Sequence, residues 1–215
     1  MYIPEKFRQT DSVAIQQLIS EQPLATVIIA TAAGMEASHI PLYWVAVDAE
    51  TAVLRGHVAK ANKIWQLCAA ATDVLVIFSG PQVYISPNYY ATKQIDAKVV
   101  PTWNYLSVHL HGQLVARHEA DWKREMLNRL TTQQEASQAI PWQMTDAPAD
   151  HLDKQLQGIV GLEFTVSTVV GKWKVSQNQP VENKQSVVEH LRQQGQDNSV
   201  AMADLVSQHL PAETK

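Results

Sequence analysis

Residues 105–115, with the sequence YLSVHLHGQLV, alternate between apolar and polar side chains. The apolar members are Leu106, Val108, Leu110 and Leu114, and the polar members are Ser107, His109, His111 and Gln113. A period of two is that of a β-strand with one face in the core and one polar face. Residues 160–170 show the same alternation. The sequence therefore predicts two long, half-buried strands.

Shorter runs rich in Val, Ile and Thr predict the remaining strands. They are residues 24–31, 36–47, 52–58 and 73–78, with a short one at 82–86. Asp48-Ala49-Glu50 predicts a hairpin turn. The run 73–78 is apolar throughout, as is usual for a strand covered on both faces. We count roughly six strands in all.

Helices are predicted between and after these strands. The first helix starts at Thr10 or Asp11 and ends before Pro23. The others are predicted at residues 59–71, 119–138, 147–157, 181–194 and 199–210. The strands are mostly joined by hairpin-length turns, with one helix after the third strand, so this is not a βαβ alternation. The predicted fold class is α+β, a small antiparallel barrel with helices packed outside.

Composition limits the classes of function. The chain has 215 residues, 46% of them hydrophobic and 18% charged, which predicts a globular protein of one domain with an appendage and excludes wholesale disorder. A net charge of −4 disfavours nucleic-acid binding through bulk charge. The single cysteine fits a reducing compartment. With no apolar stretch near the ~20 residues of a membrane helix and no signal-peptide core, we expect a soluble cytoplasmic protein without a membrane partner.

The segment LRGHVAKANK, residues 54–63, gathers cations where a strand is predicted to give way to a helix. Its candidate ligands are Arg55, His57, Lys60, Asn62 and Lys63. Free N–H groups at a helix start attract anions, and cationic side chains add full charge. A doubly charged phosphate monoester suits such a place. The alternative is a solvated helix start with two surface lysines.

Two further segments carry aromatic, hydroxyl and amide side chains. The first joins GPQVYISPNYY (residues 80–90) to VPTWNY (residues 100–105), with Ser86, Thr102, Trp103 and Asn104 as candidates. It suits a planar heteroaromatic ligand, or else its aromatics fill the barrel mouth or a dimer interface. The second is GKWKVSQNQP, residues 171–180, with Trp173, Gln177 and Asn178. It either closes over a ligand or anchors the C-terminal helices by burying its tryptophan.

Other chemistry has less support. His109 and His111 can present two imidazoles to one metal, but a third ligand would have to converge there, so we predict no metal site. Cys68 lies on an apolar helix face and is interpreted as a core residue. No Ser-His-Asp elbow, P-loop or GxGxxG motif is present. No catalytic residue is assigned.

Several motifs together resemble one protein family. They are MYIP, LRGHVAKAN, GPQVYISPNYY, KVVPTWNY followed by VHLHG, DAPADHLD, IVGLEF and GKWKVSQNQP, in this order. The family is that of the FMN-binding negative transcriptional regulators, the PaiB-type proteins named for repression of protease synthesis and sporulation. The resemblance covers nearly residues 1–180 and weakens after Pro180.

This resemblance implies a six-stranded antiparallel split β-barrel of the pyridoxamine-phosphate-oxidase type, a homodimer, and FMN bound between the subunits. It implies an FMN-binding domain over residues 1–180 and a C-terminal helical extension over residues 181–215. The flavin phosphate is expected at residues 55–63, and the ring or ribityl chain beside Ser86 and the turn Thr102-Trp103-Asn104. Trp173, Gln177 and Asn178 are expected to reach across to the other subunit's flavin. The arginine-bearing substrate motif that ends the oxidases is not found here, which argues against pyridoxamine-phosphate oxidation.

Two functions follow from the resemblance and one from the fold. The first is a negative transcriptional regulator that binds FMN; DNA is a partner only if dimerisation assembles a basic stripe that one chain does not show. The alternative is an FMN-dependent oxidoreductase, such as a flavin reductase, that uses the same pocket. A third, a haem-degrading or metal-binding relative using His109 and His111, rests on the fold alone.

Overall fold

The alternating segment forms strand β6 (Thr102–Arg117) in the computed structural model, which describes residues 1–47, 52–68 and 73–211. The four apolar side chains at its even positions are each at most 5% exposed. The side chains between them are half-buried or exposed. The prediction of a strand with one core face is confirmed.

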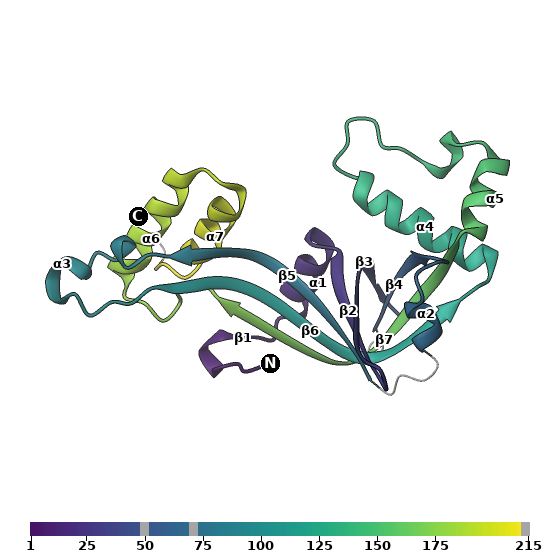
Figure 1. Cartoon of the computed structure of the whole chain (residues 1–215). Helices are drawn as coiled ribbons and strands as arrows, with labels where there is room; N and C mark the ends of the chain where they lie inside the picture. The colour runs from purple at the N-terminus through teal and green to yellow at the C-terminus, as the bar shows by residue number, and fades with distance from the viewer. Residues whose placement is uncertain (48–51, 69–72, 212–215) are drawn as a thin grey trace. The chain divides into compact units, whose positions relative to one another are not determined.

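Seven strands form one antiparallel sheet (Figure 1). They are β1 (Arg8–Gln9), β2 (Leu24–Thr31), β3 (Gly34–Ala46), β4 (Ala52–Ala59), β5 (Val74–Ile85), β6 and β7 (Ile159–Lys174). Their order is β1-β7-β4-β3-β2-β5-β6, and β7 also pairs with β6, so the sheet closes partly into a ring. The predicted α+β class is confirmed. Six strands are long, and the seventh, β1, has only two residues and escaped prediction.

The helices follow the predicted ranges closely with one exception, apart from the short helix at Lys93–Asp96, which was not predicted. They are α1 (Ser12–Glu21), α2 (Ile64–Leu67), α3 (Lys93–Asp96), α4 (Ala120–Glu135), α5 (Ala149–Gln157), α6 (Val181–Gln194) and α7 (Asp197–Ser207). The exception is α2, which has four described residues where thirteen were predicted; the last three fall outside the described residues, as does the predicted turn at residues 48–50. Within the described part of the chain, no helix is long and apolar enough to cross a membrane.

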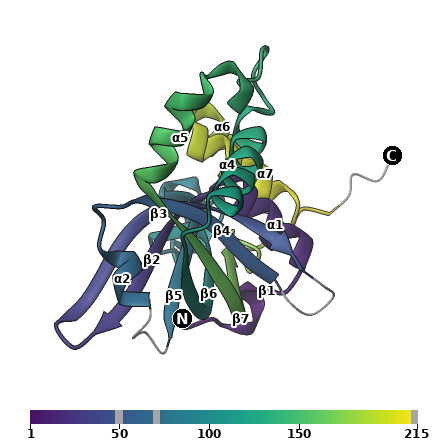
Figure 2. The same cartoon turned by 90° about the vertical axis from the view of Figure 1, so that its right-hand side faces the viewer.

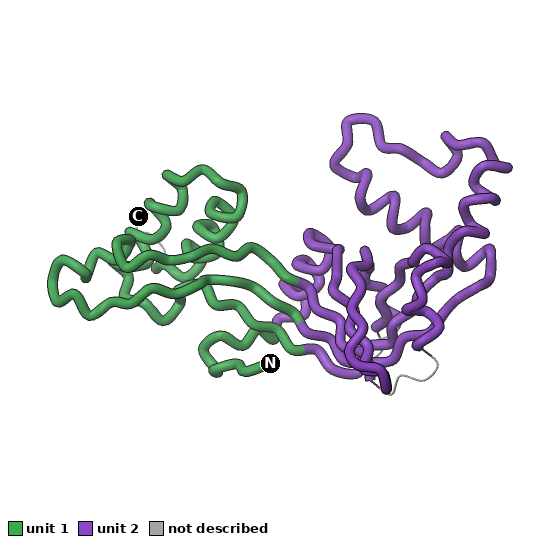
Figure 3. The backbone as a smooth tube through the Cα atoms, viewed as in Figure 1, with its two compact units in different colours: residues 1–10, 79–108, 170–215 green, residues 11–78, 109–169 purple. Residues whose placement is uncertain are grey.

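Contacts divide the chain into two compact units (Figure 3). Unit 1 comprises residues 1–10, 79–108 and 170–215, and unit 2 comprises residues 11–78 and 109–169. Strands β5, β6 and β7 contribute residues to both. The predicted domain boundary at residue 180 stays a prediction, and α6 and α7 belong to the same unit as residues 79–108.

Helix α4 covers strands β3 and β4 in unit 2 (Figure 2). Tyr43, Met126 and Leu130 form the buried centre of this contact, and Trp122 packs against it. Lys123 is buried as well, and its ammonium group donates to the carbonyl of Leu156, at the end of α5, at 2.6 Å. A cation that satisfies a helix-end carbonyl in this way stabilises the α4–α5 junction.

Helices α6 and α7 pair with each other in unit 1 and dock on the loop that follows β5. Gly195 adopts a φ of 66°, the left-handed conformation that ends α6 and lets the chain turn into α7. The ring of His190 stacks on Tyr89 with centroids 5.0 Å apart. Asn183 accepts from the Thr92 N–H at 3.0 Å. These contacts fix the loop that carries the YISPNYY motif.

Strands β6 and β7 approach each other closely at Gly112. A Cβ at this position would lie 1.9 Å from the carbonyl oxygen of Thr165 and 2.9 Å from the ring of Phe164. Backbone cannot move away as a flexible side chain can, so only glycine fits here. The close approach occurs where β7 pairs with β6 and the sheet closes.

We predict that Gly112→Ala lowers the free energy of unfolding by about 1–3 kcal/mol, because the added methyl group overpacks this junction. The measurement is urea unfolding followed by circular dichroism. Gly158→Ala is the matched control, since Gly158 has a φ of −81° and its Cβ would meet its nearest neighbour at 3.3 Å. Equal stability of the two variants would contradict the account.

Candidate functional site

The carboxylate of Glu163 on β7 lies between two arginines from neighbouring strands of unit 2. Arg55 on β4 donates from Nε to Glu163 Oε2 at 2.8 Å, and Arg117 on β6 donates from Nη2 to Oε1 at 2.5 Å. The Glu163 side chain is only 10% exposed. The guanidinium of Arg55 also lies 5.5 Å from the ring centroid of Trp122. Two cations share the Glu163 carboxylate. The hydrogen bond to Glu163 raises the pKa of Arg117, and the nearby carboxylate of Glu119 adds to this shift.

Three buried polar atoms near this cluster have no hydrogen-bond partner among the described residues: Tyr43 Oη, His57 Nδ1 and Arg117 Nε. Tyr43 on β3 is the register partner of Arg55 on β4. His57 lies two residues after Arg55 and therefore on the same face of β4. Burial lowers the pKa of His57, which favours the neutral imidazole. Cations beside unpaired polar atoms suit a ligand that brings negative charge and hydrogen-bonding groups.

The turn after β4 holds the other predicted phosphate ligands, Lys60, Asn62 and Lys63. Strand β4 ends at Ala59, and the lysines are exposed. Asn62 is half-buried, and its Oδ1 accepts from the N–H of Ile64 at 3.0 Å, so it caps α2. The turn thus places two ammonium groups beside the end of the strand that carries Arg55 and His57.

The positive charge of this turn comes from side chains and not from a long helix. The N–H of Lys60 donates to the carbonyl of Gly158 at 2.8 Å, and that of Asn62 to the carbonyl of Ala59 at 2.9 Å. Since α2 has only four described residues, its dipole adds little. A helix was predicted to begin at residue 59. The structure instead has a turn there, which carries the exposed side chains of Lys60 and Lys63, and α2 begins at Ile64.

Unit 1 contains a cavity of about 220 Å³ beside the start of β6 and the end of β7. Three predicted ligands, Thr102, Asn104 and Asn178, line it. Lys98, Lys174 and Ser176 line it as well and were not assigned from the sequence. Lys174 and Ser176 belong to the GKWKVSQNQP segment, so this motif indicated one wall of the cavity but not which of its side chains line it. Lys98 lies outside the segment.

Asn104 is the most buried polar residue of this cavity, at 1% exposure. Its Nδ2 donates to Ser176 Oγ at 2.9 Å. Its Oδ1 has no hydrogen-bond partner among the described residues, although it is fully buried. A buried unpaired acceptor costs free energy, so such an atom marks a place where a ligand donor or an ordered water belongs.

Lys174 forms the polar wall of the same cavity. Its ammonium group donates to the hydroxyl of Thr102 and, at 2.9 Å, to the carbonyl of Trp103. Burial is the main cause that lowers the pKa of Lys174, and the nearby charge of Lys172 adds to it. The cavity therefore holds a partly desolvated cation that gains from a ligand with hydrogen-bond acceptors.

The remaining predicted ligands of unit 1 have partners within their own chain. Ser86 caps the short helix after β5 by accepting from the N–H of Asn88 at 3.2 Å. Trp173 is 9% exposed and buried in its own chain. Both polar atoms of the Gln177 amide bond the backbone, at Val175 N and at the carbonyl of Trp173. These three side chains position the cavity wall.

Trp103 differs from them because it is 53% exposed. It forms an edge-to-face pair with Tyr84, which is 44% exposed, with ring centroids 5.9 Å apart. Large exposed aromatics on one strand pair are typical of a surface that binds a ligand or a second chain.

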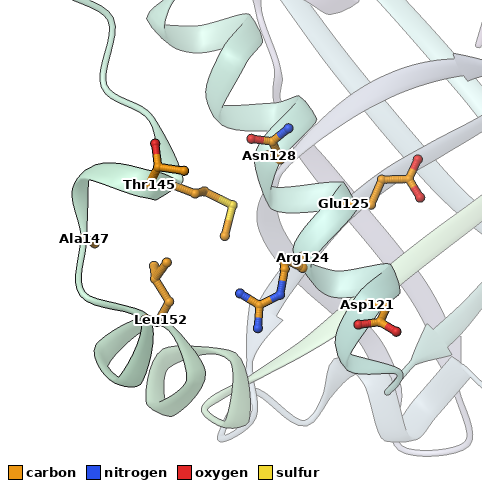
Figure 4. A pocket seen from close by; sticks show the side chains of 9 residues that line it. Asp121, Arg124, Glu125, Asn128, Thr145, Ala147 and Leu152 are labelled. Carbon is orange, nitrogen blue, oxygen red and sulfur yellow. The ribbon is translucent and has the colours of Figure 1, made fainter.

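A larger cavity, of about 720 Å³, lies in unit 2 between α4 and α5 (Figure 4). Asp121, Arg124 and Asn128 of α4 line one side, and Leu152 of α5 lines the other. Arg124 donates to Asp153 at 2.7 Å, so its charge is already paired. No predicted site residue lines this cavity, although Ala147, Ala149 and Leu152 of the DAPADHLD motif do.

Histidine and cysteine chemistry has little geometric support. His111 Nδ1 lies 3.2 Å from Asp73 Oδ2. Within residues 1–47, 52–68 and 73–211, no three His, Cys, Asp or Glu side chains gather as metal ligands do. Burial raises the pKa of the Cys68 thiol to about 11, so this cysteine stays protonated at neutral pH.

Comparison with known proteins gives three findings. The sequence matches the family model described as "Putative FMN-binding domain" over residues 1–168. It is 31% identical over 210 residues to the protease synthase and sporulation protein PAI 2 of Bacillus subtilis, a match that covers 98% of each chain. Among solved structures, the FAD and heme binding protein from Mycobacterium smegmatis is similar, with a TM-score of 0.58, 18% identity, and coverage of 78% of this chain and 73% of that one.

A second solved structure, the flavocytochrome Anf3 from Azotobacter vinelandii, has a TM-score of 0.58 and 13% identity, with coverage of 78% of this chain and 69% of that one. At such identities the two structures bear on the fold alone. They confirm the split β-barrel that the sequence motifs predicted.

We predict that Glu163→Gln lowers the free energy of unfolding by about 2 kcal/mol at neutral pH, because it removes the anion shared by two partly buried arginines. Burial alone would raise the pKa of Glu163, but the hydrogen bonds and charges of Arg117 and Arg55 outweigh it and hold the pKa below its usual range. The contribution is thus fully present above the ordinary glutamate pKa of about 4.3 and is lost as the pH falls through the lowered value.

Urea unfolding at neutral and acidic pH checks this. The gap between the wild-type protein and Glu163→Gln is expected to shrink as the pH drops below the range of glutamate. A gap that stays constant with pH would show that Glu163 is not ionised in the folded protein.

Proposed function

The chain belongs to the FMN-binding domain family, and from this premise we propose that each of the two groups of residues described above contributes to a flavin site that a second copy of the chain completes. We also propose that the protein acts as a PaiB-type negative regulator of transcription. FMN is the cofactor of the family. When bound, it supplies hydride and electron transfer, and the protein supplies binding and orientation. The proposal assigns the parts of FMN to residues of this chain.

The phosphate of FMN is assigned to the group in unit 2. Lys60 and Lys63 offer exposed ammonium groups, and Arg55 lies on the preceding strand, where it shares the Glu163 carboxylate with Arg117. His57 Nδ1 has no hydrogen-bond partner among the described residues and, when it carries the proton, can donate to a phosphate oxygen. Asn62 holds the turn that presents the lysines.

The ring and ribityl chain are assigned to the group in unit 1. Thr102, Asn104 and Asn178 line the cavity there, and Trp103 offers an exposed aromatic face. Ser86, Trp173 and Gln177 hold the surrounding loops. The single observation that carries the assignment is the unpaired, fully buried Oδ1 of Asn104 in a cavity that also holds a lysine ammonium group.

The size of this cavity favours a homodimer. Sites that enclose a small-molecule ligand usually measure about 300–1,000 Å³, whereas the cavity in one chain measures about 220 Å³. One chain therefore encloses only part of a flavin. We propose that a second copy of the chain completes the site and covers the exposed pair Tyr84 and Trp103.

The proposed role in transcription rests on the similarity to the Bacillus subtilis protein. The Bacillus subtilis protein is named for protease synthesis and sporulation. With 17 basic against 21 acidic residues, this chain lacks the excess of cations that non-specific DNA binding requires. We propose that flavin binding, and not bulk charge, controls the protein's effect on transcription. A cytoplasmic location stays a prediction.

We predict that FMN binds saturably to the apo-protein and that Lys60→Ala combined with Lys63→Ala weakens its binding about tenfold, because two ammonium–phosphate contacts are lost. Binding of riboflavin, which lacks the phosphate, should not change. Quenching of flavin fluorescence measures both affinities.

The matched control removes two exposed lysines far from these residues in sequence, Lys6→Ala with Lys154→Ala, and should bind FMN as the wild-type protein does. Light scattering on the same samples is expected to give twice 23.9 kDa. Absence of FMN binding, or equal affinity of the wild-type protein for FMN and riboflavin, would refute the phosphate assignment.

We predict that deleting the gene of this protein raises the levels of a set of transcripts above those of the wild-type strain, because their repressor is lost. A wild-type copy should restore repression, and a copy with Lys60→Ala and Lys63→Ala should restore it incompletely, because less of that protein carries flavin. RNA sequencing of the four strains measures the effect. Unchanged transcripts in the deletion strain would exclude the regulatory role.

A further inference from the structure

We infer that the 220-Å³ cavity of unit 1 receives the pyrimidine edge of the flavin ring and that Asn104 recognises its N3–H group. This inference rests on the proposed function and deepens it, because it names the part of the ligand and the residue that selects it. It follows from the hydrogen-bonding capacity of the side chains that line the cavity.

The first step is the unpaired atom. Asn104 Nδ2 is occupied by Ser176 Oγ, and Asn104 Oδ1 has no partner among the described residues. Two lysines, Lys98 and Lys174, line the same cavity, and their positive charge favours the carbonyl end of the amide there over its N–H₂ end. The cavity therefore offers one buried acceptor that needs a donor.

The second step is what surrounds this acceptor. Lys98 and Lys174 carry ammonium donors, and Asn178 and Gln179 carry amides. No carboxylate belongs to the described residues that line the cavity. A ligand that fits must present one donor for Asn104 and acceptors for the lysine ammonium groups.

The third step is the matching chemistry. The pyrimidine edge of a flavin carries a carbonyl, an N–H and a second carbonyl in a row, and so offers both one donor and two acceptors. An inorganic anion offers acceptors alone and would leave Asn104 Oδ1 unpaired. An amine would add a third cation beside Lys98 and Lys174. The cyclic imide edge supplies a donor for Asn104 Oδ1 and acceptors for Lys98 and Lys174.

Size agrees with the pattern. A cavity of about 220 Å³ is too small to enclose a whole cofactor but accommodates one end of a ring system. Lys174 then lies at the wall of the cavity, where its ammonium group can donate to a ring carbonyl while Thr102 and Trp103 hold it in place. Asn104 acts as the specificity-determining residue.

The test compares FMN with FMN methylated at N3, which keeps both carbonyls but has no donor. The wild-type protein is expected to bind the methylated flavin about 10- to 100-fold more weakly, the range found when a buried acceptor loses its partner. Fluorescence quenching gives both dissociation constants. Because this pair of ligands needs no variant, the result does not depend on the folding of a mutant.

Variants separate the hydrogen bond from a steric clash with the methyl group. Asn104→Leu removes the acceptor and should lower the discrimination between the two flavins about tenfold. Asn104→Asp keeps an acceptor and should retain discrimination. Asn128→Leu, an exposed asparagine on α4, is the control and should behave as the wild-type protein. Thermal melts report whether each variant folds.

The outcomes separate the two proposals. If the wild-type protein binds both flavins equally, the role of Asn104 is wrong while FMN binding stands. If discrimination is the same in Asn104→Leu as in the wild-type protein, it is steric and the inference is also wrong. If neither flavin binds, the proposed function itself fails and takes this inference with it.

Discussion

The hydrogen bonds that Glu163 accepts from Arg55 and Arg117 join three neighbouring strands of the sheet, β4, β7 and β6. This happens where the sheet closes and where Gly112 lets the backbones of β6 and β7 approach. One carboxylate thereby orients the two arginines and, through β4, the segment that continues to His57 and the lysine-bearing turn. A substitution of Glu163 is therefore expected to alter both the stability of the fold and the position of the residues assigned to the phosphate.

The sequence predicted those parts of the fold that depend on local periodicity. The alternation in β6 identified its buried face, whereas in β7 Glu163, expected on the polar face, is buried, and Val166 and Val170 are only half-buried. Strand β5 was expected as two separate runs, residues 73–78 and 82–86, yet it is continuous from Val74 to Ile85. The described pairing of β2 with β5 covers only residues 74–77 of β5, so at Pro81 no β2 neighbour needs an N–H donor, and the proline is tolerated. Such tolerance depends on tertiary pairing, which no local pattern reveals.

The site was predictable as segments but not as side chains. The motif GKWKVSQNQP marks one wall of the unit 1 cavity, but the side chains of Trp173 and Gln177 are used internally, and Lys174 and Ser176 line the cavity instead. Strand β7 ends at Lys174, and Ser176 has a φ of 59° in the left-handed region, so the alternation of a strand does not extend to the residues that follow. Likewise, Asn62 caps a short helix and leaves the two lysine ammonium groups exposed.

The central claim is that the unpaired oxygen of Asn104 marks the flavin site. A crystal structure of the protein with FMN tests it most directly. We expect flavin density in the cavity of unit 1, with the N3 atom within hydrogen-bond distance of Asn104 Oδ1. Flavin density confined to the larger cavity between α4 and α5, beside Arg124, with the cavity at Asn104 filled only by water, would contradict it.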